Sequence, residues 1–408
     1  MTNLFLALPS TDGYLLSIDE IGTELRVERL RREHGELVGE LTVASHLPGT
    51  RSKNGTLHVA DFNLSSARAR VERARILAER ANTNDLDWTG ILEELCQSVV
   101  AAERAGRPAT ALRDVPAPLP DDSVTIDGTR ILRRLPMCLF GDGADGKSYL
   151  ALYWAVRLAE LGWRVLYADW EFSGEDHRDR LERITGPDMP DGILYVRCDR
   201  PLVDEADRLR RIVAEERIDY LIADSVAFAC DGPPEAAEVA ARYFRALRRI
   251  AVGSLNVAHV RQENGDQKPF GSAFWHNGFR STIFAKRSTE APEAVLDVGL
   301  FNRKQSTGPL SRPTGYRIDF GDGRTTFAAT EVADMIDLAN RLPVRQRMFQ
   351  LLGGAGALTM VEIASRLDVP LDTIVKTTKR HEGKVFVRLP GADGVYRIGL
   401  LAQGAGRA

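Results

Sequence analysis

The feature that most constrains the fold of this 408-residue chain is the segment Gly141–Ser148, which reads GDGADGKS. It fits the phosphate-loop pattern, in which glycines let backbone N–H groups surround a polyphosphate. The apolar run 137–140 precedes the segment and predicts a buried strand, and the run 149–159 follows it and predicts a helix. Strand, glycine loop and helix in this order are what phosphate binding requires, because the helix N-terminus adds partial positive charge.

The residue types of this loop predict ATP and Mg²⁺ as cofactors. Lys147 is expected to reach the β- and γ-phosphates, and the Ser148 hydroxyl is expected to hold Mg²⁺. Two carboxylates, Asp142 and Asp145, lie inside the loop and are unfavourable beside a polyphosphate unless they point outward. The residues predicted to surround the nucleotide are Gly141, Asp142, Gly143, Ala144, Asp145, Gly146, Lys147, Ser148 and Tyr149.

Length and composition set the broad class of the protein. The length predicts two or three domains, and 44% hydrophobic with 27% charged residues is ordinary for a soluble protein. No apolar run reaches membrane-spanning length, and the first residues lack the basic start of a secretory signal, so a cytoplasmic protein without membrane contact is expected. The cysteines form no C-x-x-C pair, which favours reduced thiols over a zinc or redox centre. They are Cys96, Cys138, Cys198 and Cys230.

Residues 1–105 are predicted to form an N-terminal α+β domain of unassigned role. The runs 25–30 and 40–44 alternate like half-buried strands. Asn63 is expected to cap a long helix that reaches about Ala81, and a second helix is expected over 87–104. Residues 106–122 contain four prolines and predict a linker.

Residues 123–330 alternate between strand and helix patterns. Strands are expected at 165–168, 193–196, 220–224 and 255–260, and residues 280–330 look richer in β-structure. This alternation predicts an α/β fold with a central, mostly parallel sheet.

The segment 341–400 is predicted to be a winged helix-turn-helix. Helices are expected at 345–352, 360–367 and 371–380, followed by two alternating runs that predict a β-hairpin. From Arg341 to the end there are 11 basic and 5 acidic residues, whereas the rest of the chain is net acidic. A basic terminal domain on an acidic body suggests that nucleic acid, if bound, contacts this part.

Three polar residues at the ends of predicted strands complete a hydrolytic site. Asp224 ends an apolar strand and is suited to support Mg²⁺ through water, although a strand-end aspartate is also common without such a role. Glu171 ends the strand after the phosphate-loop helix and is suited to orient and deprotonate the attacking water. Asp169 competes for this role but sits further inside the strand. His259 ends the fifth strand and is suited to sense the γ-phosphate, or simply to make a local hydrogen bond.

In this order, Gly141–Ser148, Glu171, Asp224 and His259 resemble the RecA-like ATPase core of the AAA family ATPases, most closely the RepA/DnaB-type hexameric helicase branch. The resemblance covers about residues 123–330. It implies that Lys147 and Ser148 bind phosphate and Mg²⁺, that Glu171 is the catalytic base, that Asp224 supports Mg²⁺ and that His259 is the sensor. The N-terminal unit does not look like the helical N-terminal domain of DnaB.

The resemblance also implies a basic finger that reaches into the site of a neighbouring subunit. The segment 301–308 is similar to the family's finger segment, which makes Arg303 and Lys304 the candidates and Arg280 a further one. The alternative is a solvated basic turn. Such a finger would make the site an interface between copies, and the resemblance implies a homo-hexameric ring.

Two regions are candidates for contact with DNA. In the loop 261–272, Arg261 and Lys268 are suited to follow phosphates and Phe270 is suited to stack on a base of a single strand, unless its ring folds inward. In the predicted third helix of the C-terminal domain, Lys376, Lys379 and Arg380 are suited to contact duplex DNA. Winged helices also bind proteins, which is the alternative for this domain.

The leading hypothesis is a ring-forming ATPase that acts on DNA as a helicase or translocase in the replication of a plasmid, phage or mobile element. One alternative is a recombination or annealing ATPase that forms filaments. Another is an ATP-switched regulator that binds one DNA sequence and hydrolyses ATP only to reset its state.

Overall fold

The computed structural model describes residues 3–8, 12–52, 54–83, 86–106, 109–117, 122–260, 268–270, 273–321, 323–391 and 394–401. Contacts divide the chain into two compact units. The first contains Met1–Pro120, Asp204–Arg217 and Arg248–Ala251, and the second contains the rest of the chain. None of the helices in the described ranges is both long enough and apolar enough to cross a membrane.

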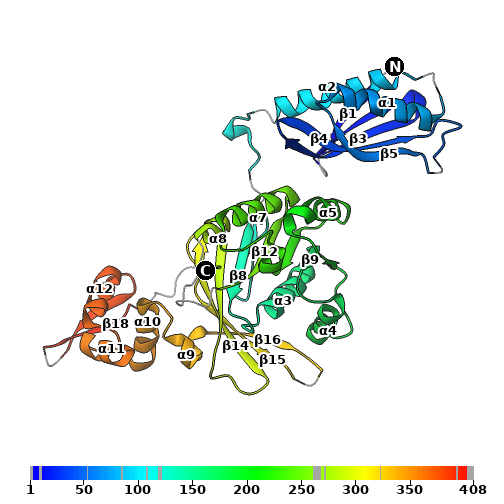
Figure 1. Ribbon diagram of the computed structural model, residues 1–408. Helices are drawn as coiled ribbons and strands as arrows, with labels where there is room; N and C mark the ends of the chain where they lie inside the picture. The colour runs from blue at the N-terminus through cyan, green and yellow to red at the C-terminus, as the bar shows by residue number, and fades with distance from the viewer. Residues whose placement is uncertain are drawn as a thin grey trace. The chain divides into compact units, whose positions relative to one another are not determined.

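The first unit contains a five-stranded antiparallel sheet whose strands are neighbours in chain order. Two helices lie side by side across one face of this sheet (Figure 1). Leu25 and Leu41 of the sheet pack against Leu77 and Leu92 of the helices in one buried cluster. The elements are β1 (Asn3–Leu8), β2 (Gly13–Ile18), β3 (Thr23–Glu33), β4 (Glu36–Ser45), β5 (Thr56–Asn63), α1 (Ala67–Ala81) and α2 (Trp88–Ala105), with a 3₁₀ turn at Asp19–Ile21.

The start of α1 differs from the prediction. Asn63 ends β5 instead of capping the helix, and its Oδ1 accepts a hydrogen bond from the Ser65 N–H at 3.0 Å. The cap is Ser66, whose hydroxyl accepts the Ala69 N–H at 3.3 Å. Asparagine and serine both favour this position, so the local pattern offered two caps and the end of β5 decided between them. The cap of α2 is Asp87, where the sequence predicted the helix to begin.

The second unit is built on a nine-stranded mixed sheet, which confirms the α/β class. Its strand order is β10-β9-β11-β12-β8-β13-β14-β15-β16. The strands from β10 to β13 are parallel, and β14 to β16 extend the sheet with antiparallel pairs. The strands are β8 (Pro136–Gly141), β9 (Val165–Asp169), β10 (Ile193–Arg197), β11 (Tyr220–Asp224), β12 (Gly253–His259), β13 (Ser281–Arg287), β14 (Val295–Gln305), β15 (Thr314–Asp319) and β16 (Thr326–Thr330). A separate hairpin pairs β6 (Ser123–Ile126) with β7 (Thr129–Leu132).

Helices cover both faces of this sheet (Figure 1). Leu255 and Val257 of β12 lie in the same buried cluster as Trp154 of α3. Asn256, between them, accepts a hydrogen bond from the Tyr243 hydroxyl of α7 at 2.8 Å. Because side chains alternate along a strand, α3 and α7 lie on opposite faces. The helices of this unit are α3 (Lys147–Glu160), α4 (Gly174–Thr185), α6 (Val226–Ala229), α7 (Ala237–Ile250), α8 (Ala273–Gly278) and α9 (Ile336–Ala339), with a 3₁₀ turn at Val332–Asp334. Nearly all of α5 (Leu202–Glu215) and the 3₁₀ turn at Leu112–Asp114 belong to the first unit.

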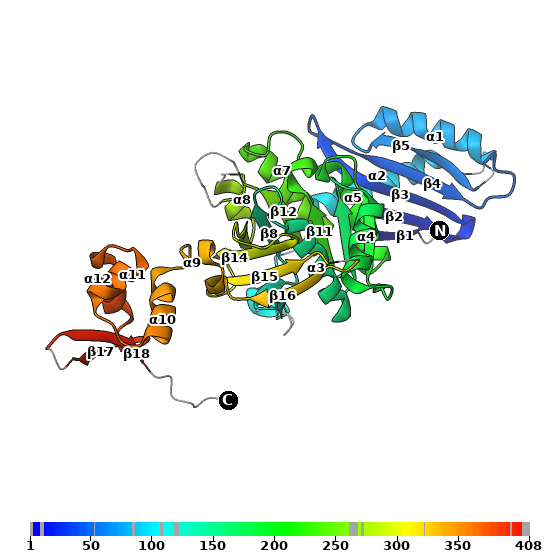
Figure 2. The same cartoon turned by 90° about the horizontal axis from the view of Figure 1, so that it is seen from below.

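The C-terminal segment contains three helices followed by a hairpin, in the order that the sequence predicted (Figure 2). Met348, Ile363, Ile374, Phe386 and Ile398 form its small core. Thr359 and Glu362 close a reciprocal capping box at the start of the second helix. The elements are α10 (Val344–Ala355), α11 (Met360–Leu367), α12 (Leu371–His381), β17 (Phe386–Pro390) and β18 (Tyr396–Leu400).

Candidate nucleotide-binding site

The register of the parallel strands brings the predicted site residues to one edge of the sheet. Asp169 at the end of β9 pairs with Asp224 at the end of β11, and Asp224 pairs with Val257 of β12. His259, at the end of β12, pairs with Gly141, where the phosphate loop begins. The carboxyl ends of parallel strands are where α/β sheets bind ligands, so the strand order itself assembles this site.

A pocket of about 200 Å³ opens at this edge. It is lined by Gly143, Ala144, Gly146, Lys147, Ser148, Tyr149, Glu171, Phe172, Arg180, Asp224, Val257 and His259. Five residues that the sequence singled out for separate chemical roles therefore share one pocket, namely Lys147, Ser148, Glu171, Asp224 and His259.

The phosphate loop needs glycine at two of its positions. Gly146, immediately before α3, has φ +74°, and a Cβ there would lie 2.7 Å from Leu296 Cδ2. A Cβ on Gly141 would lie 2.5 Å from the backbone oxygen of Ala285. The backbone of the loop is thus held close to β13 and β14, and only glycine fits these approaches.

The two loop aspartates are held away from the cradle by other parts of the chain. Asp145 is 1% exposed, and its Oδ2 accepts the Asp142 N–H at 2.8 Å while its Oδ1 accepts the Arg287 N–H at 3.2 Å. Burial raises the pKa of Asp145, which these two hydrogen bonds partly offset. Asp142 forms an ion pair with Lys286 at 2.9 Å. Both carboxylates brace the loop, which resolves the conflict between their charge and that of a polyphosphate.

Lys147 is buried at the centre of the pocket. The residue is 5% exposed, and its ammonium group donates a hydrogen bond to the backbone oxygen of Asp142 at 2.5 Å. Burial lowers the pKa of Lys147, and the nearby carboxylates of Asp145, Asp224 and Glu171 oppose this decrease. The ammonium is thus desolvated, which strengthens its attraction to a phosphate group.

Asp224 is suited to support a Mg²⁺ ion. It is 0% exposed, its Oδ2 accepts the Tyr167 hydroxyl at 2.7 Å, and its Oδ1 has no hydrogen-bond partner among the described residues. Burial raises the pKa of Asp224, and the hydroxyls of Tyr167 and Ser148 partly offset the increase. A carboxylate oxygen without a partner beside the Ser148 hydroxyl is the oxygen donor set that Mg²⁺ prefers. Tyr167 was not predicted from the sequence, because an apolar strand gives no sign of which side chain faces Asp224.

Asp169 and Glu171 have different surroundings. Asp169 Oδ1 accepts the N–H groups of Glu171 and Phe172 at 2.9 and 3.0 Å, and its Oδ2 accepts the Tyr195 hydroxyl at 3.0 Å. Burial raises the pKa of Asp169, but His177, whose Nε2 lies 3.6 Å from Oδ2, and the hydrogen bonds from these backbone groups outweigh it and lower the pKa to about 2. Asp169 is therefore occupied in holding the turn after β9, whereas Glu171 is exposed and faces the pocket.

His259 lines the pocket near Lys147 and Glu171. Burial and the Lys147 charge lower the pKa of His259, and the carboxylates of Glu171 and Asp142 act in the opposite direction. The imidazole is consequently neutral at pH 7 and presents one donor and one acceptor nitrogen.

Arg180 is a pocket residue that the sequence did not indicate. Its guanidinium lies 4.9 Å from the ring centre of Tyr149 and 4.4 Å from that of Phe172. The other arginines of α4, Arg178 and Arg183, form exposed ion pairs along the helix. Because α4 is rich in charged residues, no signal in the sequence distinguishes Arg180 from the other two arginines. Only the packing of α4 beside the phosphate loop places Arg180 in the pocket.

The predicted finger residues lie outside this pocket and contact their own chain. Arg303 and Lys304 are in strand β14 and not in a turn. The Arg303 guanidinium lies over the rings of Phe284 and Phe301, at 5.5 and 5.3 Å. The Lys304 ammonium donates to the backbone oxygens of His276 and Asn277, both at 2.9 Å. Arg280, the further candidate, is exposed.

The predicted single-strand contacts are placed only in part. Arg261 lies outside the described residues, and Lys268 is exposed. Phe270 does not offer its ring to a base, because it is 6% exposed and packs 5.3 Å from the ring of Trp275. The aromatic cluster beneath α8, which includes Phe244 and Phe279, draws the ring inward.

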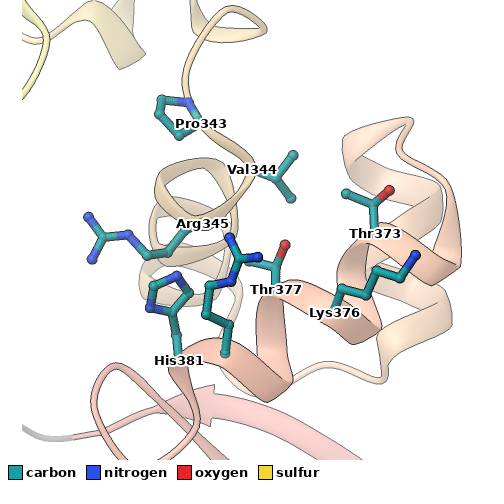
Figure 3. A pocket seen from close by; sticks show the side chains of 8 residues that line it. Pro343, Val344, Arg345, Thr373, Lys376, Thr377 and His381 are labelled. Atoms are coloured by element: carbon teal, nitrogen blue, oxygen red, sulfur yellow. The ribbon is translucent and has the colours of Figure 1, made fainter. Parts of the chain in front are cut away.

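A second hollow, of about 400 Å³, lies in the C-terminal segment between α10 and α12 (Figure 3). Of the predicted DNA contacts on α12, Lys376 and Arg380 line it, and Lys379 does not. Arg345 and His381 join them from the two helices. The complete lining is Pro343, Val344, Arg345, Thr373, Lys376, Thr377, Arg380 and His381, and it contains no acidic residue.

Residues 101–265 match a family model described as an AAA domain. Among solved structures, the chain is similar to the KaiC-like protein PH0186 from Pyrococcus horikoshii OT3, with 16% identity and a TM-score of 0.39 over 48% of this chain and 91% of that chain. It is similar to a DnaB-like replicative helicase, with 13% identity and a TM-score of 0.37 over 48% and 57%. It is also similar to the flagellar accessory protein FlaH from Methanocaldococcus jannaschii, with 12% identity and a TM-score of 0.37 over 48% of this chain and 91% of that chain.

These structural likenesses are too distant to assign a family, and none of the curated proteins compared with the sequence matches it. The family match covers the phosphate loop, the turn after β9 that carries Glu171, and the strands that end in Asp224 and His259. Together with the strand–glycine loop–helix geometry of 136–160, it identifies the centre of this chain as a P-loop NTPase core.

Proposed function

We propose that this protein is an ATP-hydrolysing, RecA-like motor that assembles into a ring, as a homo-hexamer, and acts on DNA as a helicase or translocase. The observation that carries the hydrolytic part is the convergence of a lysine, a hydroxyl, two carboxylates and an imidazole in one pocket beside the phosphate loop. A site that only binds a nucleotide needs no exposed glutamate in its lining, and Glu171 is one.

The residues of the pocket divide the chemistry between them. Lys147 and the loop N–H groups bind the β- and γ-phosphates and stabilise the charge that develops on them. Ser148 and Asp224 hold Mg²⁺, which when bound neutralises phosphate charge. Glu171 orients a water molecule and accepts its proton as the water attacks. His259 contacts the γ-phosphate and reports its presence along β12.

The finger from a neighbouring subunit is part of the proposal. Arg303 and Lys304 can reach another subunit only by leaving the rings and carbonyl groups that they contact in their own chain. Arg280, which directly precedes β13, is exposed and needs no such rearrangement. Among the three candidates we therefore favour Arg280 as the residue to test first.

Binding of duplex DNA is assigned to the C-terminal hollow. Figure 3 shows Arg345 from α10 beside His381 at the end of α12, with Lys376 and two threonines nearer the start of α12. Burial lowers the pKa of His381, as do the charges of Arg345, Arg380 and Lys384. A positively charged hollow with hydroxyl donors favours phosphate oxygens, and an exposed helix of this size fits the major groove.

The experiment that tests the motor measures ATP hydrolysis by the full chain with and without single-stranded DNA, together with displacement of a labelled strand. Stimulated hydrolysis with displacement supports the proposal. DNA-stimulated hydrolysis without displacement, with filaments in the microscope, favours the recombination or annealing ATPase. Tight binding to one duplex sequence with negligible turnover favours the ATP-switched regulator and contradicts a motor.

A further inference from the structure

A cationic cluster in the first unit, far in sequence from the nucleotide pocket, has no role in the proposed motor. It consists of His58 on β5 and of Arg73 and Arg80 on α1. The two arginines are seven residues apart and share one face of the helix. We propose that these three residues form a binding site for a phosphate oxyanion.

The first observation is the convergence of both guanidinium groups on one imidazole. His58 is 6% exposed, and its Nε2 is in hydrogen-bond contact with Arg73 Nη1. Arg80 Nη1 lies 3.5 Å from His58 Nδ1. A neutral imidazole has one acceptor nitrogen, so it can satisfy only one of the two arginines. The imidazole therefore leaves one of the two guanidinium groups without an acceptor on the ring.

The second observation is the absence of a countercharge. Among the described residues, neither Arg73 nor Arg80 forms an ion pair with a carboxylate. Other arginines of this unit do so: Arg70, on the same helix, pairs with Glu93 at 2.6 Å. The remaining hydrogen bonds of the two arginines go to backbone oxygens, from Arg73 to Asp61 and from Arg80 to Leu57.

The third observation is a donor left over inside the cluster. Arg73 Nε is buried and has no hydrogen-bond partner among the described residues. Burial lowers the pKa of Arg73, and the Arg80 charge adds to this decrease while Glu72 opposes it. Burial and the two arginines also lower the pKa of His58 to about 4, so the imidazole is neutral at pH 7. A partly buried charge without a countercharge lowers the stability of the fold unless a ligand of opposite charge binds to it.

The chemistry of the cluster selects a phosphate group over a carboxylate. Two guanidinium groups carry more N–H donors than the hydrogen bonds above use, and the oxygens of a tetrahedral anion can accept several of them. A dianionic phosphate neutralises both cations, whereas one carboxylate neutralises only one. Arg80 is exposed, so an anion from solvent can contact its guanidinium group. The phosphate can belong to a small molecule or to a nucleic-acid backbone.

The experiment uses the full chain with Lys147→Ala, which weakens phosphate binding in the core. Inorganic phosphate and a single-stranded thymidine oligonucleotide are titrated separately, and the pKa of the His58 imidazole is followed by NMR, with His58→Gln to assign its signal. A bound anion stabilises the protonated ring, so the pKa of His58 is expected to rise from about 4. We expect Arg80→Gln to weaken phosphate binding at least fivefold and Arg75→Gln, an exposed arginine of the same helix, to leave it unchanged.

The two probes separate the sources of the phosphate. If the oligonucleotide raises the pKa of His58 at a lower concentration of phosphate groups than inorganic phosphate does, the ligand is a nucleic-acid backbone. If only inorganic phosphate raises this pKa, the ligand is a small molecule. Arg80→Lys, which keeps the charge and loses the fork, is expected to bind with intermediate strength. An unchanged pKa of His58 with both probes, or an equal loss of binding in Arg75→Gln, overturns the proposal. ATP hydrolysis by the Arg80→Gln chain, measured with Lys147 intact, keeps this test separate from that of the motor.

Discussion

The carboxylate of Asp169 accepts the backbone N–H of Glu171 at 2.9 Å and thereby fixes the turn from which the Glu171 side chain enters the nucleotide pocket. The two acidic residues stand two positions apart and have different tasks. Asp169 is completely buried and saturated with hydrogen bonds, whereas Glu171 is exposed at the pocket. The proposed base, Glu171, and the residue that positions it, Asp169, can therefore be separated by mutation.

Replacing Glu171 by glutamine is expected to leave ATP binding intact and to lower kcat by at least about 100-fold, because the amide cannot accept the proton of the attacking water. Lys147→Ala is expected to weaken ATP binding at least about tenfold, since a charge-assisted contact with phosphate is lost. Fluorescent-nucleotide titration and steady-state hydrolysis measure the two effects. Normal turnover by Glu171→Gln contradicts its assignment as the base.

Replacing Tyr167 by phenylalanine is expected to alter the pH dependence of hydrolysis. The Tyr167 hydroxyl donates to Asp224 and lowers its pKa, so its removal raises that pKa further. Because Mg²⁺ requires the ionised carboxylate, the acid limb of the kcat/KM profile is expected to shift to higher pH. A profile that does not move shows that Asp224 does not control activity. Tyr153→Phe, whose hydroxyl bonds to Asp127, is the matched control.

Replacing Arg180 by glutamine is expected to weaken nucleotide binding by about tenfold, because the guanidinium lines the pocket between two aromatic rings. Arg178→Gln removes an exposed arginine of the same helix that pairs with Glu182 at 3.3 Å, and we expect no change in affinity. Calorimetric titration with a non-hydrolysable ATP analogue measures both. Equal affinities for the two variants remove Arg180 from the site.

Replacing Arg280 by alanine is expected to leave ATP binding unchanged and to lower hydrolysis by roughly 1,000-fold, the effect of a finger residue on the transition state. Mixing Arg280→Ala with Lys147→Ala subunits tests whether it acts in trans. Partial recovery of activity is expected, since some interfaces then join an intact pocket to an intact finger. If Arg303→Ala shows this behaviour and Arg280→Ala does not, the finger is Arg303.

Replacing Arg345 and Arg380 by glutamine is expected to weaken duplex DNA binding roughly two- to fivefold for each residue at moderate salt. Each change is expected to reduce the slope of log affinity against log salt by about 0.9, because one phosphate contact is lost. Both side chains are exposed, so the fold is expected to persist. Arg366→Gln on α11 is the matched control. An equal loss in that variant shows non-specific attraction rather than a phosphate site.

The sequence was sufficient to predict the elements that carry the site. A glycine loop between an apolar strand and a helix has few alternatives, so β8 and α3 lie where the pattern indicated. Asp224 and His259 could be picked out because each stands at the end of an apolar run that predicts a strand. The same local signals predicted α11 and the order of elements in the C-terminal segment.

Only the tertiary structure decided what the side chains contact, because those contacts join residues far apart in the chain. It turned Asp142 and Asp145 away from the cradle by pairing them with β13, brought Tyr167 to Asp224, and selected Arg180 from a helix full of charge. It also buried Phe270 against Trp275. Local propensity and periodicity determine which segments become strands and helices, whereas strand order and packing determine which of their side chains meet.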